Sequence, residues 1–192
     1  MASTPVQLIV GLGNPGAKYS KTRHNAGFWF VEALANTVSA SFRVENKFSG
    51  EACKIDIAGG SVWLLKPTTF MNRSGLSVKQ ISSFYKIPVN SILVVHDELD
   101  LPPGTARLKE GGGHGGHNGL RDIHAHLGKE YKRLRLGVGH PGDRNKVVDY
   151  VLSQVNTGDE IEIRNSIDNA LDVIDWVVGG DLQKAMNRLH SD

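Results

Sequence analysis

Apolar and polar residues alternate along the chain in a pattern that predicts strands and helices in turn. Residues 8–10 form a short apolar run, which is typical of a buried strand. Residues 26–38 carry apolar side chains at spacings of three and four, which predicts a helix. Two strands joined by a glycine turn are predicted at 51–57 and 61–65, and a strongly apolar strand at 91–95. This succession is typical of an α/β fold.

The second half of the chain continues this pattern and ends in helices. We predict a strand near 106–108, a helix opened by the glycine-rich segment 111–119, and a half-buried strand at 133–138. Thr157 begins a capping-box pattern for one long helix, and Asp181 can cap a last helix after a glycine pair.

The length and composition fit one globular domain. The chain has 192 residues, of which 40% are hydrophobic and 22% charged, so neither disorder nor a fibrous fold is indicated. Because no repeat or linker interrupts it, we expect a single α/β domain over residues 1–192, with a twisted, mostly parallel or mixed sheet flanked by helices. The single cysteine, Cys53, allows no intrachain disulfide and fits a reducing cytosol. Without a membrane-length apolar stretch or a signal peptide, a soluble cytoplasmic protein is expected.

Basic residues are concentrated in one stretch of the chain. The formal net charge is only +2, but residues 105–146 contain nine basic and four acidic side chains, a local net charge of +5. The rest of the chain therefore carries −3. A basic stretch on a nearly neutral protein favours a polyanionic partner, although an ordinary solvated surface can have the same composition.

A histidine occupies a position at which α/β proteins place catalytic groups. His24 follows the first predicted strand and the glycine loop 11–16, where a helix is about to begin. If Thr22 caps that helix, the positive end of the helix dipole disfavours imidazolium and keeps His24 neutral, able to accept a proton. Asp97, just past the strand at 91–95, would reach the same sheet edge if the two strands are parallel, and could orient the second ring nitrogen. A capping or packed histidine is the alternative.

The glycine loop 11–16 also fits the dinucleotide-binding pattern G-x-G-x-x-G. In that motif the helix begins inside the glycines, and an acidic residue about 20 positions further on ends a second strand. Here residues 15–16 begin a turn, and the acid near that distance, Glu32, lies inside the predicted helix. The pattern therefore disfavours a nucleotide cofactor.

Four histidines in and after the glycine-rich segment suggest a second alternative, a metal site. They are His114, His117, His124 and His126. No cysteine and no Glu-x-x-His pair accompanies them, and the last two fall on the polar face of the predicted helix. The glycines favour instead a close approach of the backbone to a bulky ligand, beside which Asn118 offers an amide donor and acceptor. We therefore expect no metal.

Six motifs taken together resemble those of bacterial-type peptidyl-tRNA hydrolases. They occur in order between residue 8 and about residue 150, and no motif position is substituted, whereas the tail after Tyr150 carries no signature. The motifs are 11–16 (GLGNPG), 19–27 (YSKTRHNAG), 66–75 (KPTTFMNRSG), 97–100 (DELD), 113–122 (GHGGHNGLRD) and 139–142 (GHPG).

The resemblance implies an enzyme that hydrolyses the ester between tRNA and a peptide or N-blocked aminoacyl group, and so releases free tRNA for translation. It implies that His24 is the general base acting on water, that Asp97 orients it, and that Asn14 helps to distinguish blocked from free amino groups. Further side chains would bind the substrate in the same cleft, namely Tyr19, Phe70, Met71, Asn72 and Asn118. The basic stretch then gains a partner, because the tRNA phosphates are expected to contact Lys109, Arg135, Arg144 and Lys146.

The resemblance also implies what accompanies the activity. Peptidyl-tRNA would be the partner of a monomeric protein that uses no cofactor, metal or nucleotide and binds no membrane. A function of another class stays open, a non-catalytic tRNA- or RNA-binding domain, whose activity would not depend on His24.

Overall fold

One mixed sheet of seven strands lies at the centre of the computed structural model, which describes residues 3–191; the strand order is β2-β3-β4-β1-β5-β7-β6. Four neighbouring strands are parallel: β4 (Gly60–Pro67), β1 (Leu8–Gly11), β5 (Ile92–Glu98) and β7 (Lys132–Gly137). The outer strands run antiparallel to their neighbours: β2 (Arg43–Glu45) and β3 (Gly50–Ile57) on one side, β6 (Ala106–Glu110) on the other. The mixed sheet expected from the sequence is confirmed.

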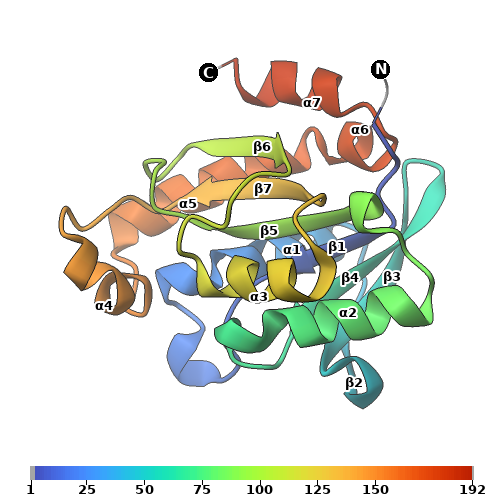
Figure 1. The fold of residues 1–192 in the computed structure, drawn as a ribbon. Coiled ribbons are helices and arrows are strands. Elements are labelled where there is room, and N and C mark those ends of the chain that lie inside the picture. The colour runs from blue at the N-terminus through green and yellow to red at the C-terminus, as the bar shows by residue number, and fades with distance from the viewer. Residues whose placement is uncertain (1–2, 192) are drawn as a thin grey trace.

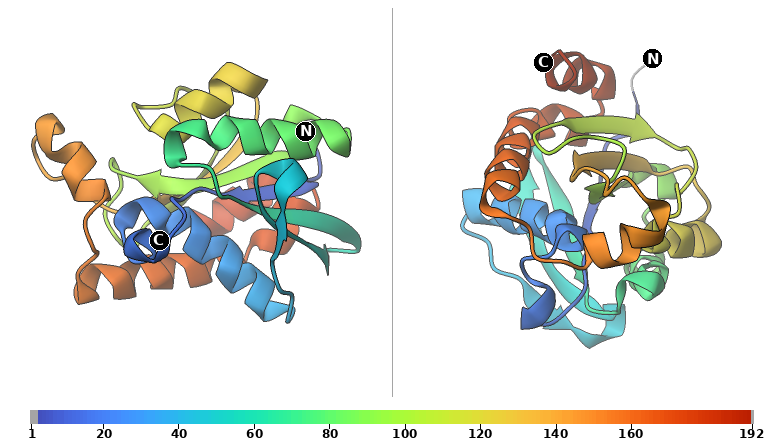
Figure 2. Two further views of the ribbon diagram at one scale, coloured as in Figure 1. Left: turned by 90° about the horizontal axis from the view of Figure 1, so that it is seen from below. Right: turned by 90° about the vertical axis from the view of Figure 1, so that its left-hand side faces the viewer.

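Helices cover both faces of this sheet (Figures 1 and 2). One face carries α1 (Ala26–Thr37), α5 (Thr157–Leu171) and α6 (Ile174–Val178), and the other carries α2 (Ser74–Phe84) and α3 (Asn118–Leu127). The last helix, α7 (Leu182–Leu189), packs against α6 and the edge strand β6, while α4 (Val147–Val151) projects at one end of the sheet (Figure 1). Short 3-10 helices cover Ala17–Tyr19, Arg23–Asn25, Asn46–Phe48, Met71–Arg73, Val89–Ser91 and Arg144–Lys146.

The central strands separate two apolar cores. Ile9 and Val95 point into the core beneath α1 and α5, whereas Val10 and Val94 point into the core beneath α2 and α3. This follows from the two-residue period of a strand, and it explains why the central strands are apolar without interruption. Within residues 3–191, none of the helices has the length and apolar character needed to cross a bilayer.

The start of α1 rests directly on the carboxyl ends of β1 and β5. Leu12 N donates to Val95 O at 3.0 Å, which continues the pairing of the two strands past Gly11. Gly27, in the first turn of α1, leaves no room for a side chain, because a Cβ atom there would collide with the Val95 carbonyl and the backbone of Leu12. This close packing brings the turn before α1 next to the end of β5.

Several local predictions are corrected by the structure. The strand predicted to stop at Val95 continues to Glu98, because β7 pairs with it beyond the end of β1, so Asp97 is a strand residue opposite Leu136. The strand predicted as half-buried at 133–138 is buried on both faces, since β7 lies between β5 and β6.

The predicted helix boundaries near the C-terminus also change. Asn156, not Thr157, caps α5, and its Oδ1 accepts a hydrogen bond from Asp159 N at 2.8 Å. The single long helix is divided into α5 and α6 around Val173. The cap predicted for the last helix is confirmed, because the Asp181 side chain accepts from Lys184 N at 3.2 Å.

Candidate active site

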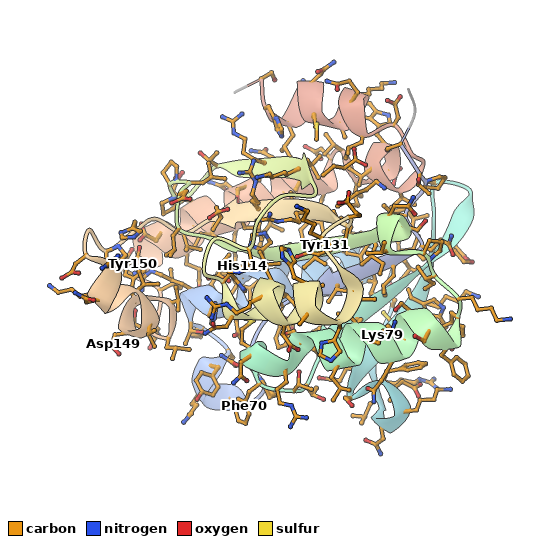
Figure 3. The ribbon with its side chains drawn as sticks, in the orientation of Figure 1. Phe70, Lys79, His114, Tyr131, Asp149 and Tyr150 are labelled. Carbon is orange, nitrogen blue, oxygen red and sulfur yellow. The ribbon has the colours of Figure 1, made fainter. Side chains whose placement is uncertain are left out.

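A cavity of about 650 Å³ lies beyond the carboxyl ends of β1 and β5. Side chains from separate segments surround it, including Phe70 from the loop before α2 and His114 from the glycine-rich loop (Figure 3). All eight residues predicted to be catalytic or to bind the substrate line it: His24, Asp97, Asn14, Tyr19, Phe70, Met71, Asn72 and Asn118. Of the four predicted phosphate contacts, Lys109, Arg135 and Arg144 also line the cavity, whereas Lys146 is exposed next to Arg144 and does not.

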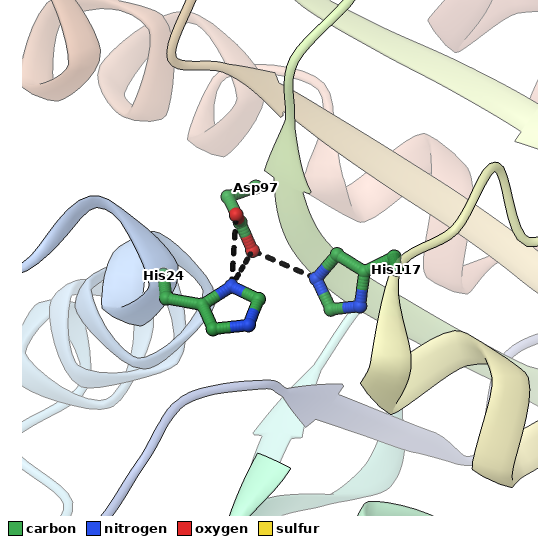
Figure 4. A group of neighbouring side chains, drawn as sticks. All are labelled: His24, Asp97 and His117. Atoms are coloured by element: carbon green, nitrogen blue, oxygen red, sulfur yellow. Dashed lines mark hydrogen bonds and ion pairs between the residues drawn. The ribbon is translucent and has the colours of Figure 1, made fainter. Parts of the chain in front are cut away.

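The carboxylate of Asp97 lies between two imidazole rings (Figure 4). His24 Nδ1 is 3.0 Å from Oδ1 and 2.9 Å from Oδ2, and His117 Nε2 is 2.8 Å from Oδ1. The two rings are tilted towards each other, with 4.9 Å between their centroids. Asp97 is only 3% exposed, so these contacts compensate a charge that is almost completely removed from water.

The surrounding backbone determines which ring nitrogen carries each proton. His117 is the N-cap of α3, and its Nδ1 accepts from the backbone N–H groups of Gly119 (3.1 Å) and Leu120 (3.4 Å). Its proton is therefore on Nε2, which donates to Asp97. His24 donates to Asp97 through Nδ1, so in the neutral ring Nε2 is the unprotonated nitrogen. It makes no hydrogen bond to any residue within 3–191. That nitrogen is a free base at the wall of the cavity.

The pKa values of this group follow from burial and mutual contact. Burial alone would raise the pKa of the Asp97 carboxyl, but His24 and His117 hold it well below its usual value, so the group is ionised. Burial alone would lower the pKa of His24, but the charge and hydrogen bond of Asp97 outweigh it, so this pKa is raised above its ordinary value of 6.5.

This result corrects the expected role of the helix N-terminus. Thr22 does not cap α1 through its side chain, since its Oγ1 donates to Tyr19 O at 2.9 Å. His24 lies one turn earlier, in the 3-10 helix before α1. The expectation that a helix dipole keeps His24 neutral is therefore wrong in its direction, because the nearest charge is the Asp97 carboxylate.

The arrangement also bears on metal binding. The ligand atoms of His24, Asp97 and His117 lie within 4.8 Å of one another, which is close enough for a shared ion. In this geometry, however, the nitrogens that face the carboxylate carry protons, so the group shares hydrogen bonds. The four histidines considered from the sequence do not converge, because His117 turns to Asp97 and His126 Nδ1 turns to Asp122 O at 2.9 Å.

Two asparagines present amide donors to the cavity. Asn14 Oδ1 accepts from Met71 N at 2.7 Å, and the Asn14 backbone is held on both sides by the Asn25 side chain, at 2.8 and 2.9 Å. The oxygen of Asn118 accepts from Arg121 Nη1 at 3.0 Å. Each of these oxygens already accepts one hydrogen bond, whereas the amide N–H groups of both side chains have no partner among the described residues and can donate to a ligand.

An aromatic pair stands near these amides. Tyr19 and Phe70 meet edge to face, with centroids 6.4 Å apart, and Phe70 is 60% exposed. A large apolar ring with this exposure, at the wall of a cavity, is suited to contact a ligand.

Basic side chains of β6 and β7 lie opposite one another. Lys109 pairs with Arg133, and Arg107 pairs with Arg135. Like charges directly opposite destabilise a sheet, which a bound anion would relieve. The Nε of Arg135 is buried and has no hydrogen-bond partner among the described residues, so this guanidinium has unused donor capacity.

Sequence reasoning missed the part that His117 plays. Apart from its place in the motif 113–122, this histidine is interpreted from the sequence only as a possible metal ligand. Its position directly before a predicted helix, in a loop at the sheet edge, is nevertheless the same kind of signal that identified His24.

Comparison with known proteins agrees with these observations. The family model for peptidyl-tRNA hydrolases matches residues 8–192. Peptidyl-tRNA hydrolases of Neisseria meningitidis serogroup A and Stenotrophomonas maltophilia are 53% and 54% identical over 190 and 187 residues. These alignments cover 98% and 97% of this chain and 99% and 97% of those proteins. The crystal structure of the Acinetobacter baumannii peptidyl-tRNA hydrolase superposes with a TM-score of 0.94 at 49% identity, over 96% of this chain and 94% of that one. The chain therefore belongs to the peptidyl-tRNA hydrolase family.

Proposed function

We propose that this protein hydrolyses the ester bond between the peptide and tRNA in peptidyl-tRNA, with His24 as the general base. The observation that carries the catalytic role is the pairing of His24 with Asp97, which leaves an unprotonated Nε2 at the wall of the cavity. The substrate class is supported by the family and by relatives of about half-identical sequence that bear this name. The monomeric state and the cytoplasmic location expected from the sequence stay predictions.

The reaction proceeds by attack of water. His24 Nε2 takes a proton as the water oxygen bonds to the ester carbonyl carbon, and the Nδ1–H bond to Asp97 stabilises the imidazolium that forms. The bond from that carbon to the ribose oxygen then breaks, and the imidazolium returns the proton to the leaving oxygen. Asn72 and Asn118, both at the cavity wall, would stabilise the oxyanion through their amide N–H groups.

The free amide donors also explain selectivity for a blocked amine. An N-acylated substrate carries a carbonyl oxygen beside its α-nitrogen, which can accept from the Nδ2 groups of Asn14 and Asn118. A free α-ammonium has only donors, so it would bring a desolvated charge against other donors. The unpaired amide N–H groups would therefore favour a substrate that carries a carbonyl oxygen beside its α-nitrogen.

The basic residues would hold the tRNA without reading its sequence. Lys109, Arg135 and Arg144 line the cavity, and Lys146 extends the charge beyond it. Phosphate contacts carry no sequence information, which suits an enzyme that accepts many tRNAs.

The alternative, a non-catalytic RNA-binding domain, does not explain the hydrogen-bonded group of His24, Asp97 and His117. RNA binding needs basic and aromatic groups on the surface. It does not need a buried carboxylate that orients a histidine, and His24 is only 8% exposed.

Replacing His24 by Ala removes the base. We expect kcat to fall by about 10²–10⁴-fold with N-acetylaminoacyl-tRNA, because a general base contributes about that factor, while the Kd for tRNA stays unchanged. Asp97→Asn should damage turnover less, since the base remains but loses its orientation. Near-normal kcat in His24→Ala would rule out this mechanism, whereas a wild-type protein that binds tRNA without hydrolysing the ester would favour the RNA-binding alternative.

The pH dependence follows from the raised pKa of His24. Only the neutral ring accepts a proton, so kcat/KM should rise with pH through a midpoint above 6.5. Asp97→Asn removes the negative charge that raises the His24 pKa, while the burial that lowers this pKa remains. The midpoint of the kcat/KM profile should therefore move below 6.5. A wild-type midpoint below 6.5, or one that Asp97→Asn leaves in place, would contradict this assignment.

Neutralising Lys109, Arg135, Arg144 or Lys146 should raise KM more than it lowers kcat. Each lost phosphate contact should reduce the slope of log Kd against log salt concentration by about one. Lys79→Gln is the matched control, because Lys79 is exposed on α2 and does not line the cavity (Figure 3). Salt dependence that stays the same in all four variants would make these charges an ordinary solvated surface.

Selectivity can be measured with the same tRNA in two forms. N-acetylaminoacyl-tRNA should be cleaved with a kcat/KM about 10⁴-fold above that of the unblocked form, because an unpaired buried charge costs several kcal/mol. Asn14→Asp should narrow this ratio, since one carboxylate oxygen keeps the bond to Met71 N while the other meets the ammonium. Equal kcat/KM values for the two substrates in the wild type would refute the role given to the asparagines.

A further inference from the structure

Two further buried side chains stand behind the His24–Asp97–His117 group. Arg133 on β7 and His96, the residue before Asp97 on β5, are almost fully buried. Arg133 Nε donates to His96 Nε2 at 3.2 Å, and His96 Nδ1 donates to the backbone oxygen of Asp97 at 2.8 Å. These side chains thus form a continuous hydrogen-bonded chain that ends on the backbone of Asp97.

Arg133 determines which nitrogen of His96 donates and which accepts. A guanidinium can only donate, so His96 Nε2 must be unprotonated and Nδ1 must carry the proton. Burial, together with the charge of Arg133, holds the pKa of His96 well below its usual value, so the ring stays neutral. His96 is therefore a fixed spacer between Arg133 and Asp97.

The other end of Arg133 holds the glycine-rich loop. Its Nη1 donates to Gly113 O at 2.8 Å and to Gly111 O at 3.4 Å. Four glycines of this loop have positive φ angles, at Gly111, Gly112, Gly115 and Gly116. Such a backbone is costly to order and has few side chains to anchor it. The loop leads directly to His117, whose ring also packs edge to face on His96, with centroids 5.2 Å apart.

We propose that Arg133 and His96 are positioning residues that hold the glycine-rich loop at a fixed distance from β5, so that His117 donates to Asp97 and limits the share of the carboxylate available to His24. The kinetic part of this proposal rests on the proposed function. The structural part concerns the protein alone.

The consequence for His24 follows from the groups around the carboxylate. Asp97 is contacted by His24 from the turn before α1 and by His117 from the loop before α3, while His96 lies beside it on β5 and Arg133 lies behind on β7. The part of α4 that faces the cavity is apolar: Val147, Val148 and Val151. If the loop moves and His117 withdraws, the carboxylate loses one donor and interacts more strongly with His24, whose pKa then rises further.

The test is a titration of the histidine side chains by ¹⁵N NMR, in the wild type and in Arg133→Lys and His96→Asn. Arg133→Lys keeps the charge, but one ammonium cannot hold His96 and both loop carbonyls in the geometry of the guanidinium. His96→Asn keeps a donor near the Asp97 backbone and removes the acceptor for Arg133. Lys129→Gln is the control, since it removes an exposed charge near the same loop and forms no part of the chain.

We expect the His24 midpoint to rise by about half a pH unit or more in both variants, with about a threefold loss of the neutral form well below the midpoint. The Nε2–H signal of His117 should change in the same variants. The double variant should show no further shift, because both substitutions break one chain. Lys129→Gln should titrate like the wild type, and the acid limb of the kcat/KM profile should follow the His24 midpoint.

Unchanged His24 and His117 titrations in folded Arg133→Lys and His96→Asn would overturn the proposal. The wild type provides a test that needs no variant, since His96 must appear as the neutral Nδ1–H tautomer across the accessible pH range. A titrating His96, or one with its proton on Nε2, would also overturn it. These readouts do not involve the substrate, so a failure of hydrolysis and a failure of the positioning chain are distinguishable.

Discussion

The structure of the site depends on one buried carboxylate that accepts hydrogen bonds from two imidazoles. Asp97 is almost fully removed from water, and an unpaired charge in such a place would be strongly destabilising. His24 and His117 both donate to it, and their ring centroids are only 4.9 Å apart. Each histidine is in turn immobilised by its backbone, one in the turn before α1 and the other as the N-cap of α3. The stabilisation of the Asp97 charge therefore depends on the positions of α1 and α3.

The fold brings these residues together although they are far apart in the sequence. Parallel pairing of β1 with β5 places the end of β1 level with Val95, and the contact of Gly27 with the Val95 carbonyl brings the preceding turn over the end of β5. On the other side, pairing of β5 with β7 continues three residues further, to Glu98, and keeps Asp97 in the strand. The carboxylate thus stands on a rigid element between two loops, which is the placement that orients a catalytic base.

Local sequence patterns predicted most of the strands and helices in order, although not β2 or α4, and they predicted the pairing of His24 with Asp97. A strand that ends in polar residues and a helix that begins near a histidine are visible in the sequence, and parallel strands bring them together. The end of β5 could not be predicted in this way, because the pairing with β7 determines it. The position of His117 before a helix is visible in the sequence, but its contact with Asp97 and the contact of the Asn14 oxygen with Met71 N are not, since both join distant segments.

The second imidazole on Asp97 has a consequence for the basicity of the first. A carboxylate that served His24 alone would raise the pKa of that ring more strongly, and a larger fraction of the base would be lost as imidazolium near neutral pH. A carboxylate with no histidine beside it would leave His24 to burial, which lowers the pKa and weakens the base. Because the carboxylate is shared between His24 and His117, the pKa of His24 lies between these two limits. The geometry that sets this balance is the distance between β5 and the glycine-rich loop, and Arg133 contacts both sides of it, through His96 on one and Gly113 on the other.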